Sequence, residues 1–200
     1  MLLNGSPVRR IGGTELNILR KIKSVFSGKS QEQQELEYLL SHGMQLGENS
    51  TILSGFHIDS GWPWLISIGD NVTISSNVTI LAHDASPNVV ECGTKLGRVT
   101  IGNNVFIGIH TTILCNTRIG DNVVVGAGSL VTRDLPSNGV YAGVPAVKVA
   151  SIEDFRKKNE QQKAQSPHFD DLHSWREWRD APEKDKEYMK KCLEDGFGFV

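Results

Sequence analysis

The chain has 200 residues, with 23 acidic and 21 basic side chains and a formal net charge of -2. A charge so close to zero argues against nucleic acid or an anionic membrane as a bulk partner. The three cysteines (Cys92, Cys115 and Cys192) are widely spaced without a CxxC motif, and no signal peptide or membrane span is recognisable, so we expect a cytoplasmic protein.

Residues 1–45 are predicted to form a polar, helical extension. Thr14 fits as the cap of a first helix carrying apolar residues from Leu16 to Phe26, and a second helix is expected at about residues 31–42. Basic residues on the first helix leave two alternatives, contact with a membrane surface or packing against the rest of the protein. Packing is favoured because the segment is short and its charge is modest, so no membrane contact is expected.

Residues 46–150 carry an aliphatic residue at every sixth position, as in the hexad IGDNVT at residues 68–73. This period is typical of a parallel β-helix, in which each hexad supplies one short strand and a turn. Three hexads make one coil, and successive coils stack about 4.8 Å apart. The predicted starts of the coils are Leu46, Ile68, Ile101 and Ile119, with a partial coil at Val140.

Every break in the period follows the third hexad of a coil, so the inserted residues are expected to leave the solenoid at one corner. The longest insertion is the loop at residues 83–98. At this corner the third position after each leading residue is predicted to stack on its equivalents in neighbouring coils. Those positions are Gly61, His83, Asn116 and Asp134.

Residues 151–200 are predicted to form a helical tail. Ser151 and Asp154 form a capping box, Pro167 interrupts the helix that follows, and a last helix is expected from Pro182 to about residue 194. Trp175 and Trp178 either line a cleft for the substrate or anchor the packing of the tail. Packing is favoured for aromatic residues at this spacing.

Four stretches of the repeat region carry a family resemblance: residues 101–108 (IGNNVFIG), 119–122 (IGDN), 125–136 (VGAGSLVTRDLP) and 142–146 (AGVPA). They resemble the hexapeptide-repeat acyltransferases, particularly the galactoside, maltose, xenobiotic and capsular-polysaccharide O-acetyltransferases. The resemblance implies an all-β solenoid, a left-handed parallel β-helix with helical N- and C-terminal extensions. It further implies acetyl-CoA as co-substrate and a homotrimer with active sites between subunits.

The same resemblance implies transfer of an acetyl group to a hydroxyl of a sugar or surface-glycan precursor, as in polysaccharide biosynthesis. An antibiotic or an amino sugar is the alternative acceptor. His83, which opens the long loop, is the expected general base, because a neutral imidazole can remove the hydroxyl proton near pH 7. The group that orients its ring is left open among Asp84, Asn116, Glu91 and a backbone carbonyl.

The acceptor is expected to lie near the coil below His83, where relatives contact it. His57 and Asp59 are the candidates for binding its hydroxyl groups, and Trp62 or Trp64 for stacking on a sugar face. Galactoside enzymes carry an asparagine near this point, whereas this chain has Gly55.

The resemblance lays acetyl-CoA along the coils, with hydrogen bonds to the backbone of Gly108, Ile109, Gly126 and Ala127. Thr132 and Arg133 are expected near the nucleotide, where a cation suits the phosphates. Relatives carry a further cation directly after the Pro-Ala pair near the end of the solenoid. Here it is displaced by one residue, to Lys148.

Two other classes of protein compete with this interpretation. A metal hydrase on the same fold would place His83, His110 and Cys115 around Zn²⁺, but Cys115 stands where such enzymes carry a second histidine. A non-catalytic scaffold would leave the long loop and the Thr132-Arg133 corner unexplained. The acetyltransferase is therefore favoured, with no metal expected.

Overall fold

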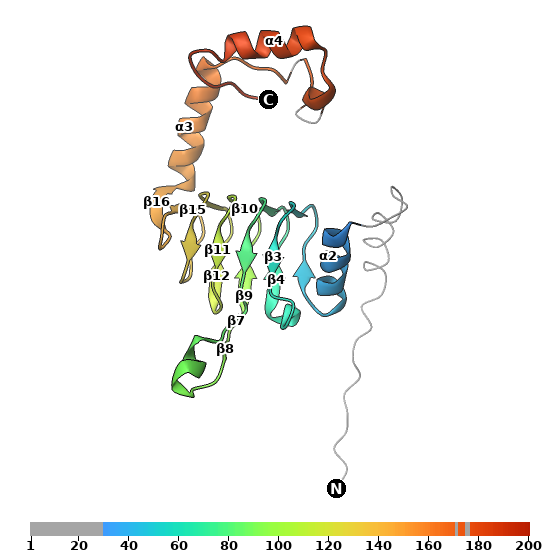
Figure 1. The fold of residues 1–200 in the computed structure, drawn as a ribbon. Helices are drawn as coiled ribbons and strands as arrows, with labels where there is room; N and C mark the ends of the chain where they lie inside the picture. Colours follow the sequence, from blue (N-terminus) through green and yellow to red (C-terminus); the bar gives the residue numbers. More distant parts are fainter. Residues whose placement is uncertain (1–29, 171, 175–176) are drawn as a thin grey trace, which may run out of the picture. The chain divides into compact units, whose positions relative to one another are not determined.

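The computed structural model describes residues 30–170, 172–174 and 177–200 (Figure 1). The expected helix from Thr14 to Phe26 lies outside these residues, whereas the expected second helix is present as α2 (Gln31–Ser41). Residues 39–200 form one compact unit.

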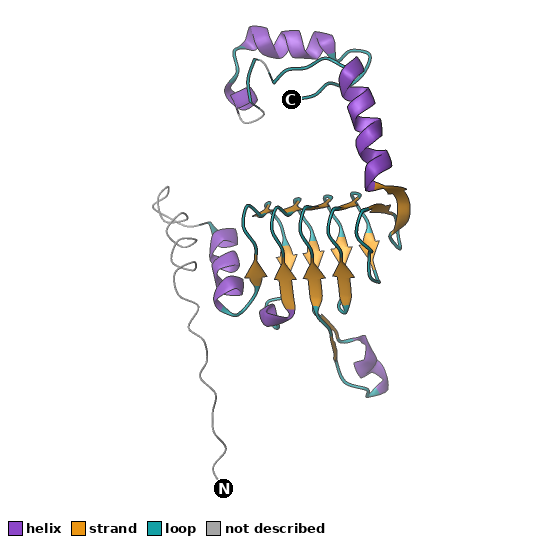
Figure 2. Cartoon of the chain, turned by 180° about the vertical axis from the view of Figure 1, so that it is seen from behind, coloured by secondary structure: helices purple, strands orange, loops and turns teal. Residues whose placement is uncertain are grey.

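Residues 45–151 wind into a left-handed β-helix with three sheets of short strands (Figures 1 and 2). The first sheet contains β1 (Gln45–Leu46), β4 (Ile66–Ile68), β9 (Val99–Ile101) and β12 (Thr117–Ile119). The second contains β2 (Thr51–Ile52), β5 (Thr73–Ile74), β10 (Val105–Ile107), β13 (Val123–Val125), β15 (Gly139–Ala142) and the antiparallel β16 (Val147–Ser151). The third contains β3 (His57–Ile58), β6 (Thr79–Ile80), β11 (Thr112–Ile113) and β14 (Leu130–Val131). The predicted fold class is confirmed.

The leading aliphatic residues of the hexads form the core. Ile68 is in register with Ile101, which is in register with Ile119, and all three side chains are buried. Burying such a side chain contributes about 1.5–3 kcal/mol, so a continuous aliphatic column stabilises every coil through its neighbours. Leu46 is in register with Ile68, so the four predicted coil starts are confirmed.

The predicted start of the last coil at Val140 is wrong. Leu135 is the residue that pairs with Ile119, and Tyr141 lies opposite Val125. The corner between Val131 and Leu135 is therefore shorter than a hexad, not longer. The Asp134 carboxylate stabilises the shortened corner by accepting a hydrogen bond of 2.8 Å from the amide of Arg118.

Stacked asparagines hold the corner where the chain passes from the first sheet to the second. Asn71, Asn104, Asn122 and Asn138 all have φ between 54° and 60°, a region that asparagine tolerates better than most residues. The Nδ2 of each of the first three donates to the Oδ1 of the next asparagine, at 3.0–3.2 Å. This ladder keeps successive coils in register on the side away from the long loop.

The last coil is closed by Tyr141, which is buried and donates a hydrogen bond of 2.7 Å to the carbonyl oxygen of Pro136. Burial raises the pKa of the Tyr141 phenol. Strand β16 then folds back against β15, and Ser151 caps α3 (Ile152–Gln165) by accepting from the Asp154 amide at 3.0 Å. The predicted capping box is confirmed.

The tail continues through η3 (Glu177–Asp180) to α4 (Glu183–Cys192), the expected last helix. Phe169 is buried, and the rings of Trp178 and Tyr188 meet it edge to face. Trp178 is thus a packing residue, as favoured, and Trp175 lies outside the described residues. Across the described ranges, every helix is too short or too polar to traverse a lipid bilayer.

Candidate active site

The corner where the chain passes from the third sheet to the first carries both long excursions. Residues 59–65 form a loop that ends in η1 (Pro63–Leu65). Residues 81–98 contain a hairpin of β7 (His83–Asp84) and β8 (Lys95–Leu96), with η2 (Ser86–Val90) between the strands. The hairpin extends away from the coils in Figures 1 and 2. The two predicted insertions therefore leave at the same corner.

His83 and Asp59 form a hydrogen-bonded pair between these two excursions. The Asp59 Oδ2 atom contacts His83 Nδ1 and also accepts from the amide of Ala82 at 3.0 Å, while Oδ1 accepts from the amide of Gly61 at 3.1 Å. The Asp59 side chain is 3% exposed and the His83 side chain is 35% exposed. The carboxylate is therefore fixed and shielded, and Nε2 is the ring nitrogen left for a reactant.

The residue on the His83 ring is thus Asp59, which the sequence predicts to bind the acceptor, and not one of the predicted orienting groups. Asp84 follows His83 directly in a strand, so its side chain lies on the opposite face. There it accepts from the Ser86 amide at 2.9 Å and lies 3.6 Å from the Lys95 ammonium. The hydrogen bond with Ser86, helped by Lys95, lowers the pKa of Asp84.

The other two predicted orienting residues also lie elsewhere. Asn116 stacks against Gly97, where the hairpin returns to the coils: a Cβ added to Gly97 would lie 2.5 Å from the Asn116 nitrogen. Glu91 is exposed with φ 58° after η2, at the far end of the hairpin. In the described structure neither residue has a hydrogen bond with His83.

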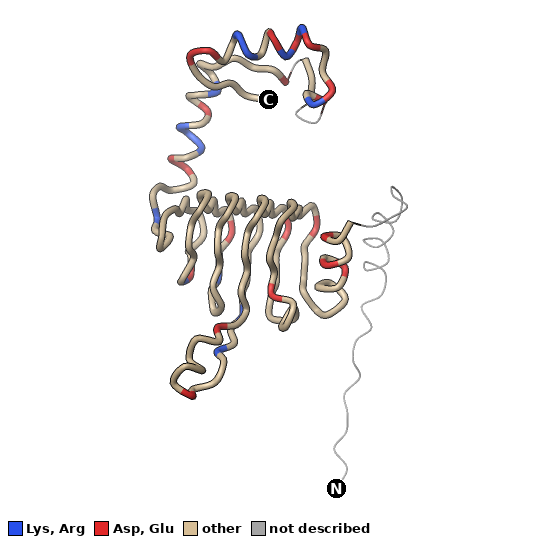
Figure 3. The backbone as a smooth tube through the Cα atoms, viewed as in Figure 1, with Lys and Arg blue, Asp and Glu red and all other residues tan. Residues whose placement is uncertain are grey.

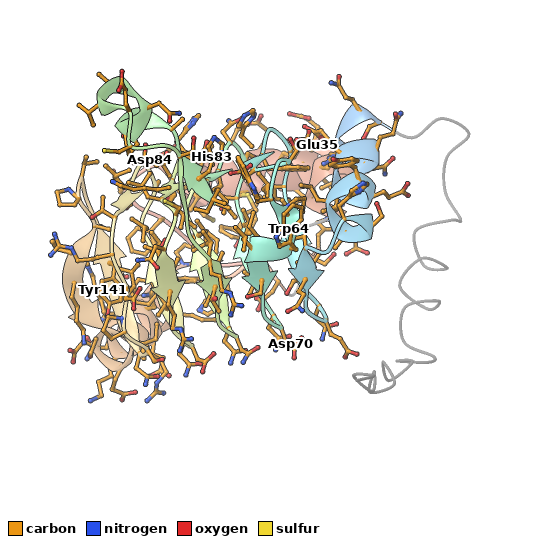
Figure 4. All side chains as sticks on the ribbon, turned by 90° about the horizontal axis from the view of Figure 1, so that it is seen from below. Glu35, Trp64, Asp70, His83, Asp84 and Tyr141 are labelled. Atoms are coloured by element: carbon orange, nitrogen blue, oxygen red, sulfur yellow. The ribbon has the colours of Figure 1, made fainter. Side chains whose placement is uncertain are left out.

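Among the remaining acceptor candidates, Trp62 is the one for which the structure describes a contact with the base. The Trp62 ring is 4.7 Å from the His83 ring, centroid to centroid, with the planes tilted by 50°. Trp64 is 60% exposed and lies in η1, whereas His57 lies opposite Thr79 in the third sheet. Figure 4 shows His83 and Asp84 beside each other, with Trp64 nearer the first coils. Trp62 is thus the candidate brought to the base.

The predicted acetyl-CoA residues Gly108, Ile109, Gly126 and Ala127 lie together at a different corner, between the second and third sheets. The backbone of Gly126 is already satisfied: its amide donates to Tyr141 at 2.8 Å, and its carbonyl accepts from Thr111 at 3.2 Å and Ser129 at 2.6 Å. Both backbone hydrogen-bonding groups of Gly126 are thus engaged within the described chain.

Ile109 and Ala127 are exposed, and within the described ranges no hydrogen bond engages the amide N–H of either residue. Gly108 is buried, and its amide donates to Val125. A Cβ on Gly108 would lie 2.5 Å from the Ala127 nitrogen, so this glycine allows the two coils to approach. Two amides without a hydrogen bond in the described structure, called the open amides below, therefore lie at this corner.

The residues predicted to contact the nucleotide lie on two different elements. The residues of the metal alternative do not lie together either. Thr132 and Arg133 are exposed on the shortened corner, and Lys148 is exposed on β16, opposite Tyr141. His110 belongs to the Ile109 corner and not to the His83 corner, and no three metal-ligating side chains gather in the described part of the chain. Figure 3 shows charges of both signs mixed along the described segments.

Two sequence profiles match the coils. Residues 98–133 match "Bacterial transferase hexapeptide (six repeats)" and residues 66–82 match "Hexapeptide repeat of succinyl-transferase". The galactoside O-acetyltransferase of Lactococcus lactis is 32% identical over 147 residues, covering 62% of this chain and 71% of the relative. The chain therefore belongs to the hexapeptide-repeat acetyltransferase family, as the resemblance predicted.

The galactoside O-acetyltransferase of Escherichia coli K12 is 38% identical over 117 residues, 57% of this chain. The match spans 58% of that relative's length. A solved galactoside acetyltransferase in complex with coenzyme A superimposes with a TM-score of 0.52 and 29% identity, covering 71% of this chain and 80% of the other. The two profile matches both lie within the β-helix.

Proposed function

We propose that the protein is an O-acetyltransferase that moves the acetyl group of acetyl-CoA to a hydroxyl of a sugar or surface-glycan precursor. The observation that carries the proposal is the buried Asp59 carboxylate on Nδ1 of the part-exposed His83. A carboxylate in this position fixes the ring and its tautomer and leaves Nε2 as the proton acceptor. Membership of the acetyltransferase family supports the same reaction.

In the proposed mechanism, His83 Nε2 takes the proton from the acceptor hydroxyl as its oxygen attacks the thioester carbonyl. A backbone N–H or an ordered water stabilises the resulting oxyanion. The carbon–sulfur bond then breaks, and the imidazolium returns the proton to the leaving thiolate, giving an ester and free CoA. Asp59 stabilises the imidazolium between the two proton transfers.

The placement of the two parts supports a site shared between copies of the chain. His83 lies at the corner between the third and first sheets, whereas the open amides of Ile109 and Ala127 lie at the corner between the second and third. We infer a homotrimer in which acetyl-CoA lies along the Ile109 and Ala127 amides of one chain, facing His83 of the next. Arg133 and Lys148 would bind the phosphate groups of acetyl-CoA.

The reaction is tested by measuring thiol release from acetyl-CoA with neutral sugars, glycan oligosaccharides, amino sugars and antibiotics, and by the mass of the product. We expect release that depends on a sugar acceptor and a product that carries one acetyl ester. Thiol release that is equal with and without every acceptor, with no acetylated product, would contradict the proposal.

Shared sites predict complementation between two inactive variants. His83→Ala removes the base, and Ala127→Trp covers the open amide with a large side chain, so each homotrimer should be inactive. Co-expression as mixed trimers should restore about a quarter of the sites. A site is active only where a chain with an intact His83 adjoins a chain with an intact Ala127, and each is present in half of the chains. Mixed trimers as inactive as both parents would place the site within one chain.

A further inference from the structure

The hairpin that carries His83 has two chemically different faces. His83 lies directly opposite Leu96 in the antiparallel pair, and Asp84 lies opposite Lys95. Side chains of directly opposed residues share a face, about 5 Å apart, while successive residues alternate between faces. One face therefore carries the imidazole and a leucine, and the other carries the Asp84–Lys95 ion pair.

Apolar side chains border the base in the described part of this chain. Leu96 is 52% exposed beside His83, and the Trp62 ring lies 4.7 Å from the imidazole. The charged groups nearest in the hairpin are turned away and paired with each other, 3.6 Å apart. Asp59 is buried, and both of its carboxylate oxygens are engaged. A positive charge on the acceptor would thus find no free carboxylate on this face of the described hairpin.

We propose that Leu96 and Trp62 determine acceptor specificity, selecting a neutral pyranoside whose reacting hydroxyl adjoins an apolar C–H face. This inference rests on the proposed acetyl transfer and narrows its acceptor class. Contact of the C–H face with the leucine and the indole favours binding, because apolar surface leaves water. An ammonium beside the hydroxyl, as in an amino sugar, would lose hydration without gaining a partner.

The test compares acceptor kinetics of the wild type, Leu96→Ala and Leu96→Glu with a neutral pyranoside and its amino-sugar counterpart. In the wild type, kcat/KM should favour the neutral sugar by about tenfold or more. Leu96→Ala should raise the KM for the neutral sugar about tenfold while the KM for acetyl-CoA stays constant. Leu96→Glu should shift the ratio towards the amino sugar, because it supplies the missing counter-charge.

Two matched variants accompany these measurements. Leu172→Ala removes an equally exposed leucine (49%) from the tail and should leave the ratio unchanged. Trp62→Ala should weaken the preference for the neutral sugar in the same direction as Leu96→Ala. A wild type that acetylates sugars while both Leu96 variants keep its ratio would overturn this inference alone. Absence of any acetyl transfer by the wild type would overturn the proposed function together with it.

Discussion

His83→Ala is expected to lower kcat for acetyl transfer by roughly 10²–10⁴-fold, the contribution of a positioned general base. The His83 side chain supplies the only ring nitrogen that the described structure places beside the Asp59 carboxylate. The affinity for acetyl-CoA should stay the same, because the open amides of Ile109 and Ala127 lie at another corner. Steady-state kinetics and calorimetric titration with CoA measure the two quantities.

The matched control is His168→Ala, which removes an exposed histidine of the tail whose Nε2 contacts the Lys163 carbonyl oxygen at 2.6 Å. It should leave kcat within about twofold of the wild type, like most surface changes away from a site. A loss of less than tenfold in His83→Ala, with both variants folded, would exclude His83 as the base.

Asp59→Asn is expected to lower kcat by roughly 10²-fold or more, because the amide is uncharged and cannot stabilise the imidazolium. It should also lower stability by about 1–3 kcal/mol. The carboxylate oxygens contact three groups: the Ala82 amide, the Gly61 amide and the His83 ring. An asparagine side chain has only one acceptor oxygen for all three. Kinetics and thermal unfolding separate the two effects.

Asp84→Asn provides the comparison, since Asp84 adjoins His83 in sequence but lies on the other face of the hairpin. Its kcat should stay within about tenfold of the wild type. If Asp59→Asn melts earlier yet keeps the wild-type kcat, Asp59 has a structural role alone and the proposed pair is wrong.

The fold was predictable because the hexapeptide period places Ile68, Ile101 and Ile119 on one stacked column. The start of the last coil was not predictable, because several aliphatic residues after Val131 could each be the first residue of that coil. Leu135 takes it through a corner of only a few residues, held by the Asp134 carboxylate. A six-residue period in the sequence reveals inserted residues more readily than it reveals a corner with fewer residues than usual.

The position of His83 at the root of the hairpin was also predictable, but its partner was not. Asp59 precedes His83 by 24 residues and reaches it because one coil stacks on the next. The neighbouring residue, Asp84, has the right chemistry in the sequence and the wrong face in the strand. Likewise, only the structure shows that the hydroxyls of Thr111 and Ser129 occupy the Gly126 carbonyl.

The most direct measurement follows a carbon-13-labelled acetyl group from acetyl-CoA by NMR in the presence of a neutral pyranoside, with the wild type and with His83→Ala. We expect the label to appear as an ester on a sugar hydroxyl with the wild type, and at a rate at least about 10²-fold lower with the variant. Label that stays on CoA, becomes free acetate or reaches the sugar equally fast with both proteins would contradict base-catalysed transfer by His83.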